Sequence, residues 1–414
     1  MLRPRPLGPP ERRRRADALV AAGLVLAVAL GAALLWGTSP RAGTVSTPAA
    51  APVATPPAAA TVPAGFTEAW RAASGATPVP VIAGPVVVTG DGGVVAGHDA
   101  ITGHVEWSYA RDVPLCTVGA GFPDRDGGRV LALYRNDDWC SELTSLRPDS
   151  GVRDRQRNPD VHPGTRLLPG GPQVTATGAR YLEAFRSDLV KTVEYGEVPT
   201  PRQVGRQPRP ACESTGFAVT SGRLAVLQRC PDETTDRLTV LDHDGAEADK
   251  PQEEFSVLLP AAGATLVAVS DDRVAVALPD PPRLQLLDGA GAPVGLVDLD
   301  VPALVPPADG VAPVTADDDR VYWWTGSQTI ALDGLDLTPL WTLPDTLGPG
   351  VDYARRLLVP VPDGLAVLDA ATGAVERELP VARNEPRAPV LPAVLGETLV
   401  EQRGTEAVAL TPSR

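Results

Sequence analysis

Residue types that usually build a catalytic or metal site are scarce in this 414-residue chain. It contains four histidines, four cysteines and one methionine, and aromatic residues make up only 4% of it. The histidines show no metal-ligand spacing, so we expect surface residues in turns: His98, His104, His162 and His243. No G-x-S-x-G, S-x-x-K or H-E-x-x-H motif occurs. The residues therefore predict no catalytic, cofactor-binding or metal-ligating side chain.

Lysine is rarer still, since Lys191 and Lys250 are the only two, and the basic charge gathers near the N-terminus. Residues 1–41 hold seven arginines and two acidic residues, which leaves 37 − 7 = 30 basic and 51 − 2 = 49 acidic residues, or −19, for the rest. Because an acidic body repels nucleic acid, we expect no nucleic-acid partner.

Long apolar stretches are absent except for one, Ala18–Trp36, which holds 19 residues without a charge. A helix of that length spans roughly 28 Å, about one bilayer core. Arg12–Arg15 precede it, and the positive-inside rule keeps them in the cytoplasm. We predict a cytoplasmic tail (1–15), a single transmembrane helix (16–36) and an extracytoplasmic C-terminal part. A cleaved signal peptide is the alternative.

Residues 37–65 are rich in proline, alanine and threonine, with Arg41 as the only charge. Such a composition cannot bury a core and predicts a disordered linker. Fully extended at about 3.1 Å per residue, it would reach about 90 Å from the membrane, either as a spacer through a wall layer or as a plain tether.

Glycine (40) and proline (45) are abundant, and they separate short Val/Leu/Ala runs that are typical of an all-β protein. A repeat of strand, turn, strand, turn and strand recurs along residues 66–414. Its central positions are Asp99, Arg147, Arg186, Asp242, Asp288, Asp333, Asp369 and Thr411. Their mean spacing is (411 − 99)/7, about 45 residues, which suits a four-stranded propeller blade. We predict one β-propeller over 66–414, with eight blades favoured over seven.

The best copies suggest a role for each conserved position of the repeat. Asp99, Asp333 and Asp369 can fix tight turns through backbone N–H bonds, and Gly103 and Gly373 supply a positive φ. Trp107 and Trp341, eight residues after an Asp, are expected to cover the gap to the next sheet. The last copy lacks its outer strand, and we expect Phe66–Trp70 to provide that strand and close the ring.

Cys116, Cys140, Cys212 and Cys230 all follow the apolar stretch. An even number in an exported domain predicts two disulfides, for which three pairings exist. The segments around the first two and the last two align as Cys, turn, strand, Cys. This favours Cys116–Cys140 and Cys212–Cys230, each within one blade. A metal site, the alternative, would need CxxC spacing and partner histidines.

The copies Asp99-Ala100-Ile101-Thr102-Gly103…Trp107, Ala331-Leu332-Asp333…Trp341 and Asp369-Ala370-Ala371-Thr372-Gly373 resemble the PQQ-binding-like β-propeller repeat, A-L-D-x-x-T-G-x-x-x-W. That family includes quinoprotein dehydrogenases, a scaffold lipoprotein of outer-membrane assembly and many actinobacterial membrane proteins. Its enzymes place two adjacent cysteines over the quinone, with calcium ligands nearby. This chain has no adjacent cysteine pair, so we expect neither PQQ nor calcium.

Two further patterns are candidates for binding sites. Arg202, Arg206 and Arg209, among prolines, could form an anion-binding patch or only solubilise a loop. Two stretches resemble the start of a calcium loop but lack further carboxylates and are interpreted as turns: Asp124-Arg125-Asp126-Gly127 and Asp242-His243-Asp244-Gly245. The favoured function is a non-catalytic, membrane-anchored scaffold for an envelope protein or cell-wall glycan. A degenerate quinoprotein-like enzyme and an extracytoplasmic sensor are the alternatives.

Overall fold

The computed structural model describes residues 15–37, 39, 42–125, 127–201 and 203–413, in two compact units, Met1–Val45 and Ser46–Arg414. In the first unit, α1 (Arg15–Gly37) is a 23-residue helix with no buried side chain. Its mean hydropathy of 2.6 makes it, within the described residues, the one helix long and apolar enough to cross a bilayer. An export signal would meet the same criterion. Arg12–Arg14 lie outside the described residues.

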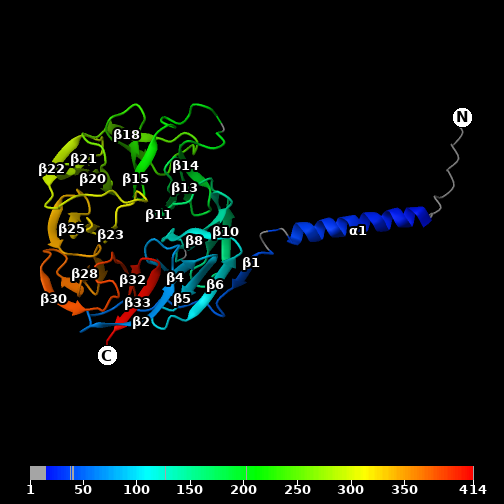
Figure 1. Ribbon diagram of the computed structural model, residues 1–414, viewed down its shortest axis with the longest axis horizontal. Coiled ribbons are helices and arrows are strands. Elements are labelled where there is room, and N and C mark those ends of the chain that lie inside the picture. Colours follow the sequence, from blue (N-terminus) through cyan, green and yellow to red (C-terminus); the bar gives the residue numbers. More distant parts are fainter. Residues whose placement is uncertain (1–14, 38, 40–41, 126, 202, 414) are drawn as a thin grey trace, which may run out of the picture. The chain divides into compact units, whose positions relative to one another are not determined.

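The second unit is a ring of eight β-sheets, so the prediction of an eight-bladed propeller is confirmed (Figure 1). Blade 1 contains β3 (Val81–Ala83), β4 (Val86–Asp91), β5 (Val94–His98) and β6 (Val105–Arg111), and β1 (Thr44–Thr47) is a fifth strand of this sheet. Blade 2 contains β7 (Leu115–Gly121), β8 (Arg129–Asn136), β9 (Trp139–Leu146) and β10 (Arg153–Arg157). Blade 3 contains β11 (Leu167–Gly170), β12 (Gln173–Ala176), β13 (Tyr181–Arg186) and β14 (Lys191–Gly196). Blade 4 contains β15 (Glu213–Val219), β16 (Arg223–Arg229), β17 (Arg237–Asp242) and β18 (Glu253–Leu258).

The other half of the ring repeats this antiparallel order. Blade 5 contains β19 (Thr265–Val269), β20 (Arg273–Pro279), β21 (Pro282–Asp288) and β22 (Pro293–Asp298). Blade 6 contains β23 (Val314–Ala316), β24 (Arg320–Trp324), β25 (Gln328–Asp333) and β26 (Pro339–Pro344). Blade 7 contains β27 (Val351–Tyr353), β28 (Arg356–Val361), β29 (Gly364–Leu368) and β30 (Val375–Pro380). Blade 8 contains β31 (Leu391–Leu395), β32 (Thr398–Arg403), β33 (Glu406–Pro412) and β2 (Phe66–Ala73).

Each predicted central position lies at or beside the end of its blade's third strand, as Asp99 does after β5 and Asp369 after β29. The first strand of each blade faces the middle of the ring and the fourth lies at its rim (Figure 1). Middle strands are largely buried, and several are continuous apolar runs, as in β29, because both of their faces contact a neighbouring blade. Rim strands such as β26 alternate in burial instead.

The ring closes through its N-terminal strand, as the sequence predicts. β2 pairs antiparallel with β33, from Phe66 opposite Pro412 to Ala73 opposite Glu406, with a bulge between Glu68 and Trp70. The first segment of the propeller thus supplies the rim strand that the C-terminal blade lacks. Because β33 is paired on both sides, blade 8 exposes no internal edge there.

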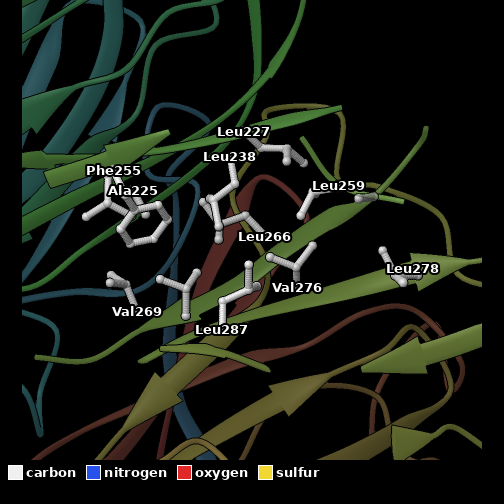
Figure 2. Close-up of a cluster of buried hydrophobic side chains, with 13 residues drawn as sticks. Ala225, Leu227, Leu238, Phe255, Leu259, Leu266, Val269, Val276, Leu278 and Leu287 are labelled. Atoms are coloured by element: carbon white, nitrogen blue, oxygen red, sulfur yellow. The ribbon is translucent and has the colours of Figure 1, made fainter. Parts of the chain in front are cut away.

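The hydrophobic core consists of one cluster for each seam between neighbouring blades. The seam between blades 4 and 5 has a large cluster that includes Leu238, Phe255 and Leu287 (Figure 2). The seam that closes the ring, between blades 8 and 1, has the smallest one: Val87, Ala100, Leu395 and Val400. The closing seam therefore depends more than the others on additional contacts.

The expected disordered linker differs from the structure beyond residue 45. From Ser46 to Gly65 the chain lies on the propeller as an extended segment, which we call the strap. Ala49 N–H donates to Ser150 O of blade 2 (3.0 Å), and Ala59 N–H donates to Gly396 O of blade 8 (3.2 Å). Composition predicts disorder here because the segment cannot bury a core of its own, yet its alanine, valine and proline side chains can still pack on a preformed surface.

Candidate functional site: seams, turns and rim of the propeller

Tryptophans at the rim join neighbouring blades. Trp107 on β6 is fully buried, and its Nε1–H donates to Pro148 O of blade 2 at 2.8 Å. Its ring covers Gly151, where an added Cβ would lie 2.7 Å from the indole. The same arrangement places Trp70 over Gly103, Trp341 over Gly373 and Phe255 over Gly291. These residues form the joints of the ring, and they are packed rather than available to a ligand.

The aspartates of the repeat form turns. Asp99 Oδ1 accepts hydrogen bonds from Thr102 N–H (2.8 Å) and Thr102 Oγ1–H (2.7 Å). Asp369 makes the same bonds to Thr372, which hold the pKa of its carboxyl below the usual value. Asp333 accepts from Leu335 N–H at 2.9 Å. Each carboxylate is thus engaged by its own turn.

Both favoured disulfides are present. Cys116–Cys140 joins the first and third strands of blade 2. Cys212 directly precedes β15 and Cys230 directly follows β16, so their disulfide closes the open end of this hairpin in blade 4. Each bridge therefore lies within one blade, as the sequence predicts, and no free cysteine occurs in the described part of the chain.

Two of the four histidines are buried, so the expectation of surface residues is wrong for them. His98 Nε2 lies 2.8 Å from Thr89 Oγ1, and its Nδ1 lies 3.1 Å from Gly103 O. Because a carbonyl only accepts, Nδ1 carries the proton and Nε2 accepts from the hydroxyl. His243 has the matching contacts with Thr220 O (3.0 Å) and Thr175 Oγ1 (2.8 Å). Burial lowers the pKa of both rings. His104 and His162 are exposed, as expected.

A buried ion-pair network connects blades 7 and 8. Arg383 and Glu401 are 1% and 0% exposed and are joined at 2.8 Å. Arg383 also donates to Val361 O (2.8 Å) and Gly364 O (3.0 Å) of blade 7. Arg403 reaches the other oxygen of Glu401 at 2.7 Å. A carboxylate neutralised on both sides is a structural anchor, because a reactive group would need a free coordination site or a proton to transfer.

A second buried network lies in blade 3. Glu183, fully buried, is joined to Lys191 Nζ at 2.6 Å and accepts from Tyr181 Oη–H at 3.0 Å. Burial raises the pKa of Glu183. Burial alone would lower the pKa of Lys191, but Glu183 and Glu194 outweigh it and raise the pKa. Asp160 N–H donates to the remaining Glu183 oxygen at 3.0 Å, so this cluster is also internally satisfied.

The arginines of the predicted anion-binding patch are used within the protein. Arg206 Nη1 contacts Glu247 (2.7 Å) and Asp249 (3.2 Å), beside a groove of about 680 Å³ on the rim of blades 3 and 4. Arg209 pairs with Glu253. Arg202 lies outside the described residues. The two described arginines therefore have local carboxylate partners.

The calcium-loop-like stretches form turns. Asp242 Oδ1 accepts from Asp244 N–H at 2.9 Å, which is the bond of an Asx turn. Arg125 N–H donates to Phe122 O at 3.0 Å in the other stretch, of which Asp126 lies outside the described residues. Among the residues that the structure describes, no three His, Cys, Asp or Glu side chains gather as metal ligands would.

The connection between β22 and β23 covers part of the inner ring. Phe217 N–H of β15 donates to Gly310 O of this connection at 2.8 Å. Asp309 beside it forms an ion pair with Arg166, which directly precedes β11 of blade 3. The segment thus leaves blade 5, contacts the inner strands of blades 3 and 4, and returns to blade 6.

The chain matches no protein-family model and no curated protein sequence. Solved structures match its fold. BamB from Moraxella catarrhalis is 14% identical, with a TM-score of 0.52, over 84% of this chain and 99% of that one. Sqt1 from Saccharomyces cerevisiae is 9% identical, with a TM-score of 0.53, over 86% and 100%. The dihydro-heme d1 dehydrogenase NirN, solved in complex with DHE, is 14% identical, with a TM-score of 0.52, over 82% and 78%. At these identities the likeness is one of fold, and this chain is an eight-bladed β-propeller protein with an N-terminal apolar helix.

Proposed function

We propose that the protein is a non-catalytic scaffold, anchored in a membrane by α1, whose propeller lies on the outer side and binds an envelope protein or glycan. The observation that carries the location is the presence, on one chain, of an unburied apolar helix and a propeller with two disulfides. Disulfides form and persist in oxidising, extracytoplasmic compartments.

The binding role is supported by the buried carboxylates, which already have partners within the protein. Glu401 and Glu183, two buried carboxylates of the kind that could serve as an acid or base, are each satisfied by a cation and further hydrogen bonds within the ring. The β22–β23 connection contacts blades 3 and 4 through Gly310 and Asp309. The faces and the rim remain as broad surfaces, and surfaces of this kind suit macromolecular partners.

The test combines topology with crosslinking in intact cells. A photo-crosslinking amino acid is placed at Ile101 or Val305, two exposed positions on connections of the propeller (53% and 81% exposed). We expect external protease to reach the propeller and one of the two positions to capture a single envelope component in stoichiometric amount. A propeller protected inside the cytoplasm, or free cysteine thiols in the native protein, would contradict the proposal.

A further inference from the structure

The rim of blade 5 differs in charge from most of the other rim strands. β22 (Pro293–Asp298) carries one charged residue, Asp298 at its end. β10, β14, β18 and β30 each carry at least two. Charged side chains on an edge strand normally prevent another strand from pairing with it. β26 also lacks charge, but Trp341 at its centre is docked on blade 7.

The outer edge of β22 has backbone groups that the blade does not use. Leu299 N–H donates inward to Pro282 O at 3.0 Å, and β22 pairs with β21 in the same antiparallel register, Val297 opposite Leu284. Because successive residues of a strand direct their backbone groups to alternate sides, Leu296 and Asp298 direct theirs away from β21. In the described residues the sheet of blade 5 ends at β22.

The same edge exposes aliphatic side chains beside a groove. Val294 is 51% and Leu296 is 52% exposed. A groove of about 320 Å³ is lined by Gln285, Pro293, Gly295 and Leu296. Gln285 is opposite Leu296 in the register, so both lie on the same face of the sheet. Gln285 is also opposite Val276, a member of the cluster between blades 4 and 5 (Figure 2), so this face is the one toward blade 4.

The groove contains a buried acceptor without a donor. Gln285 is 7% exposed, and its Oε1 has no hydrogen-bond partner among the described residues. A buried carbonyl oxygen left without a donor destabilises the protein, so a donor that enters the groove would stabilise the complex. A strand added to β22 would lie two strand spacings from β21, about 9–10 Å, which only a long side chain bridges. Lysine is such a side chain, and the acidic body favours a cation.

We propose that the β22 edge binds an extended polypeptide segment of a partner protein by strand addition. On the face toward blade 4 the segment presents aliphatic residues, which cover Val294 and Leu296, and a lysine that donates to Gln285 Oε1. A second copy of this chain fits less well, since two bodies of −19 repel and one six-residue edge pair buries less than the roughly 1,200 Å² of a stable interface. This inference rests on the proposed binding function and names its surface.

The experiment uses the full chain in detergent micelles and a capped six-residue peptide. In this peptide two valines and one lysine take alternate positions, so they share one face, and threonine takes the positions between them. Binding is measured by calorimetry, and hydrogen exchange is followed at the amides of Leu296 and Asp298. We expect saturable binding that slows exchange at both amides. A peptide with N-methyl groups on alternate backbone nitrogens should not bind, because it cannot pair with the edge.

Two variants locate the site. Leu296→Lys should weaken binding at least tenfold by placing a charge on the edge, whereas Val375→Lys, on the already charged rim strand β30, should leave affinity unchanged. Gln285→Leu should abolish the preference for lysine over norleucine in the peptide while aliphatic binding persists. The proposal is overturned if the unmodified peptide leaves both amides unprotected, or if the N-methylated peptide binds equally. Either result would rule out strand addition at β22 only. The proposed scaffold function would remain, because it is tested separately in intact cells.

Discussion

Two features restrict substitution of the glycines beneath the rim tryptophans. Their backbone is in the left-handed region, and an indole ring lies where a side chain would be. Gly103 has a φ of +73°, and an added Cβ would lie 2.5 Å from Trp70. Gly92 has a φ of +55° but open space around it. Substitution of either glycine strains the backbone, but only substitution of Gly103 also disturbs the contact between blades. Comparing the two variants therefore separates these effects.

We predict that Gly103→Ala destabilises the propeller by about 1–3 kcal/mol more than Gly92→Ala does, because the methyl group must displace the indole. Denaturant unfolding of both variants measures the difference. Equal losses of stability would show that the contact with Trp70 contributes nothing beyond the turn itself.

The buried histidines make stability depend on pH. The folded pKa of His98 is lowered by burial from its ordinary 6.5, and the bond to Gly103 O opposes this only in part. The unfolded chain therefore takes up the proton first as pH falls. The stability that the neutral ring contributes is complete above pH 6.5 and is lost as pH falls toward the folded pKa.

We predict that His98→Gln makes the free energy of unfolding less dependent on pH as the pH falls below 6.5. One proton accounts for a slope of up to about 1.4 kcal/mol per pH unit. Unfolding titrations at several pH values check this, with the exposed His104→Gln as the matched control. If both variants keep the slope of the natural chain, His98 is not the group responsible.

Residues in local patterns could be assigned from the sequence, and residues in long-range contacts could not. Asp99, Gly103 and Trp107 fall within one turn and its flanking strands, so their spacing carries the signal. The partners Arg383 and Glu401 meet only because blades 7 and 8 are neighbours. The burial of His98 likewise follows from stacking with Trp70, and the two ring centroids are 5.1 Å apart. The position of His98 beside a turn does not predict this contact.

At the scale of elements, the strap is the part whose structure the sequence misses. Val53 N–H donates to Asp149 O at 2.9 Å, and Arg377 Nη2 on β30 donates to Val62 O at 3.0 Å. Pro56 lies against the turn at Gly396. No periodicity marks such a segment, because its order derives from the surface on which it lies. Strands and blade number were predictable since each blade repeats its own turn chemistry.

We predict that the amides of Ala49, Val53 and Ala59 exchange about tenfold or more slowly than those of Ala54 and Ala58, which are exposed neighbours in the strap. Hydrogen exchange with residue-level resolution makes the comparison within one sample. Uniformly fast exchange across the strap would restore the expectation of a disordered linker.

At the scale of the whole propeller, stability depends on the closing seam. The apolar cluster there is small, and polar contacts supplement it: Gln402 Nε2 donates to Ser74 O at 3.2 Å, and Thr77 Oγ1 donates to Gln402 Oε1 at 3.1 Å. The strap reaches from blade 2 across this seam to blades 8 and 7. Strand β2 and the strap thus both connect blades across the closing seam.

We predict that a chain starting at Ser74, without β2, loses at least about 5 kcal/mol of stability relative to a chain starting at Ala64. Burial of Phe66 and the docking of Trp70 would both be lost. Both chains lack the anchor and nearly all of the strap, so the difference isolates β2. Thermal unfolding measures it, and coincident melting curves would refute closure by this strand.

The packed strap also changes the length of chain left to act as a tether. Of the 29 residues from 37 to 65, only residues 38–43 lie between α1 and β1, which already belongs to the sheet of blade 1. Six residues extend at most about 22 Å, about a quarter of the distance that a fully extended linker would cover. For the anchored scaffold that we propose, so short a tether would restrict capture to partners close to the lipid surface.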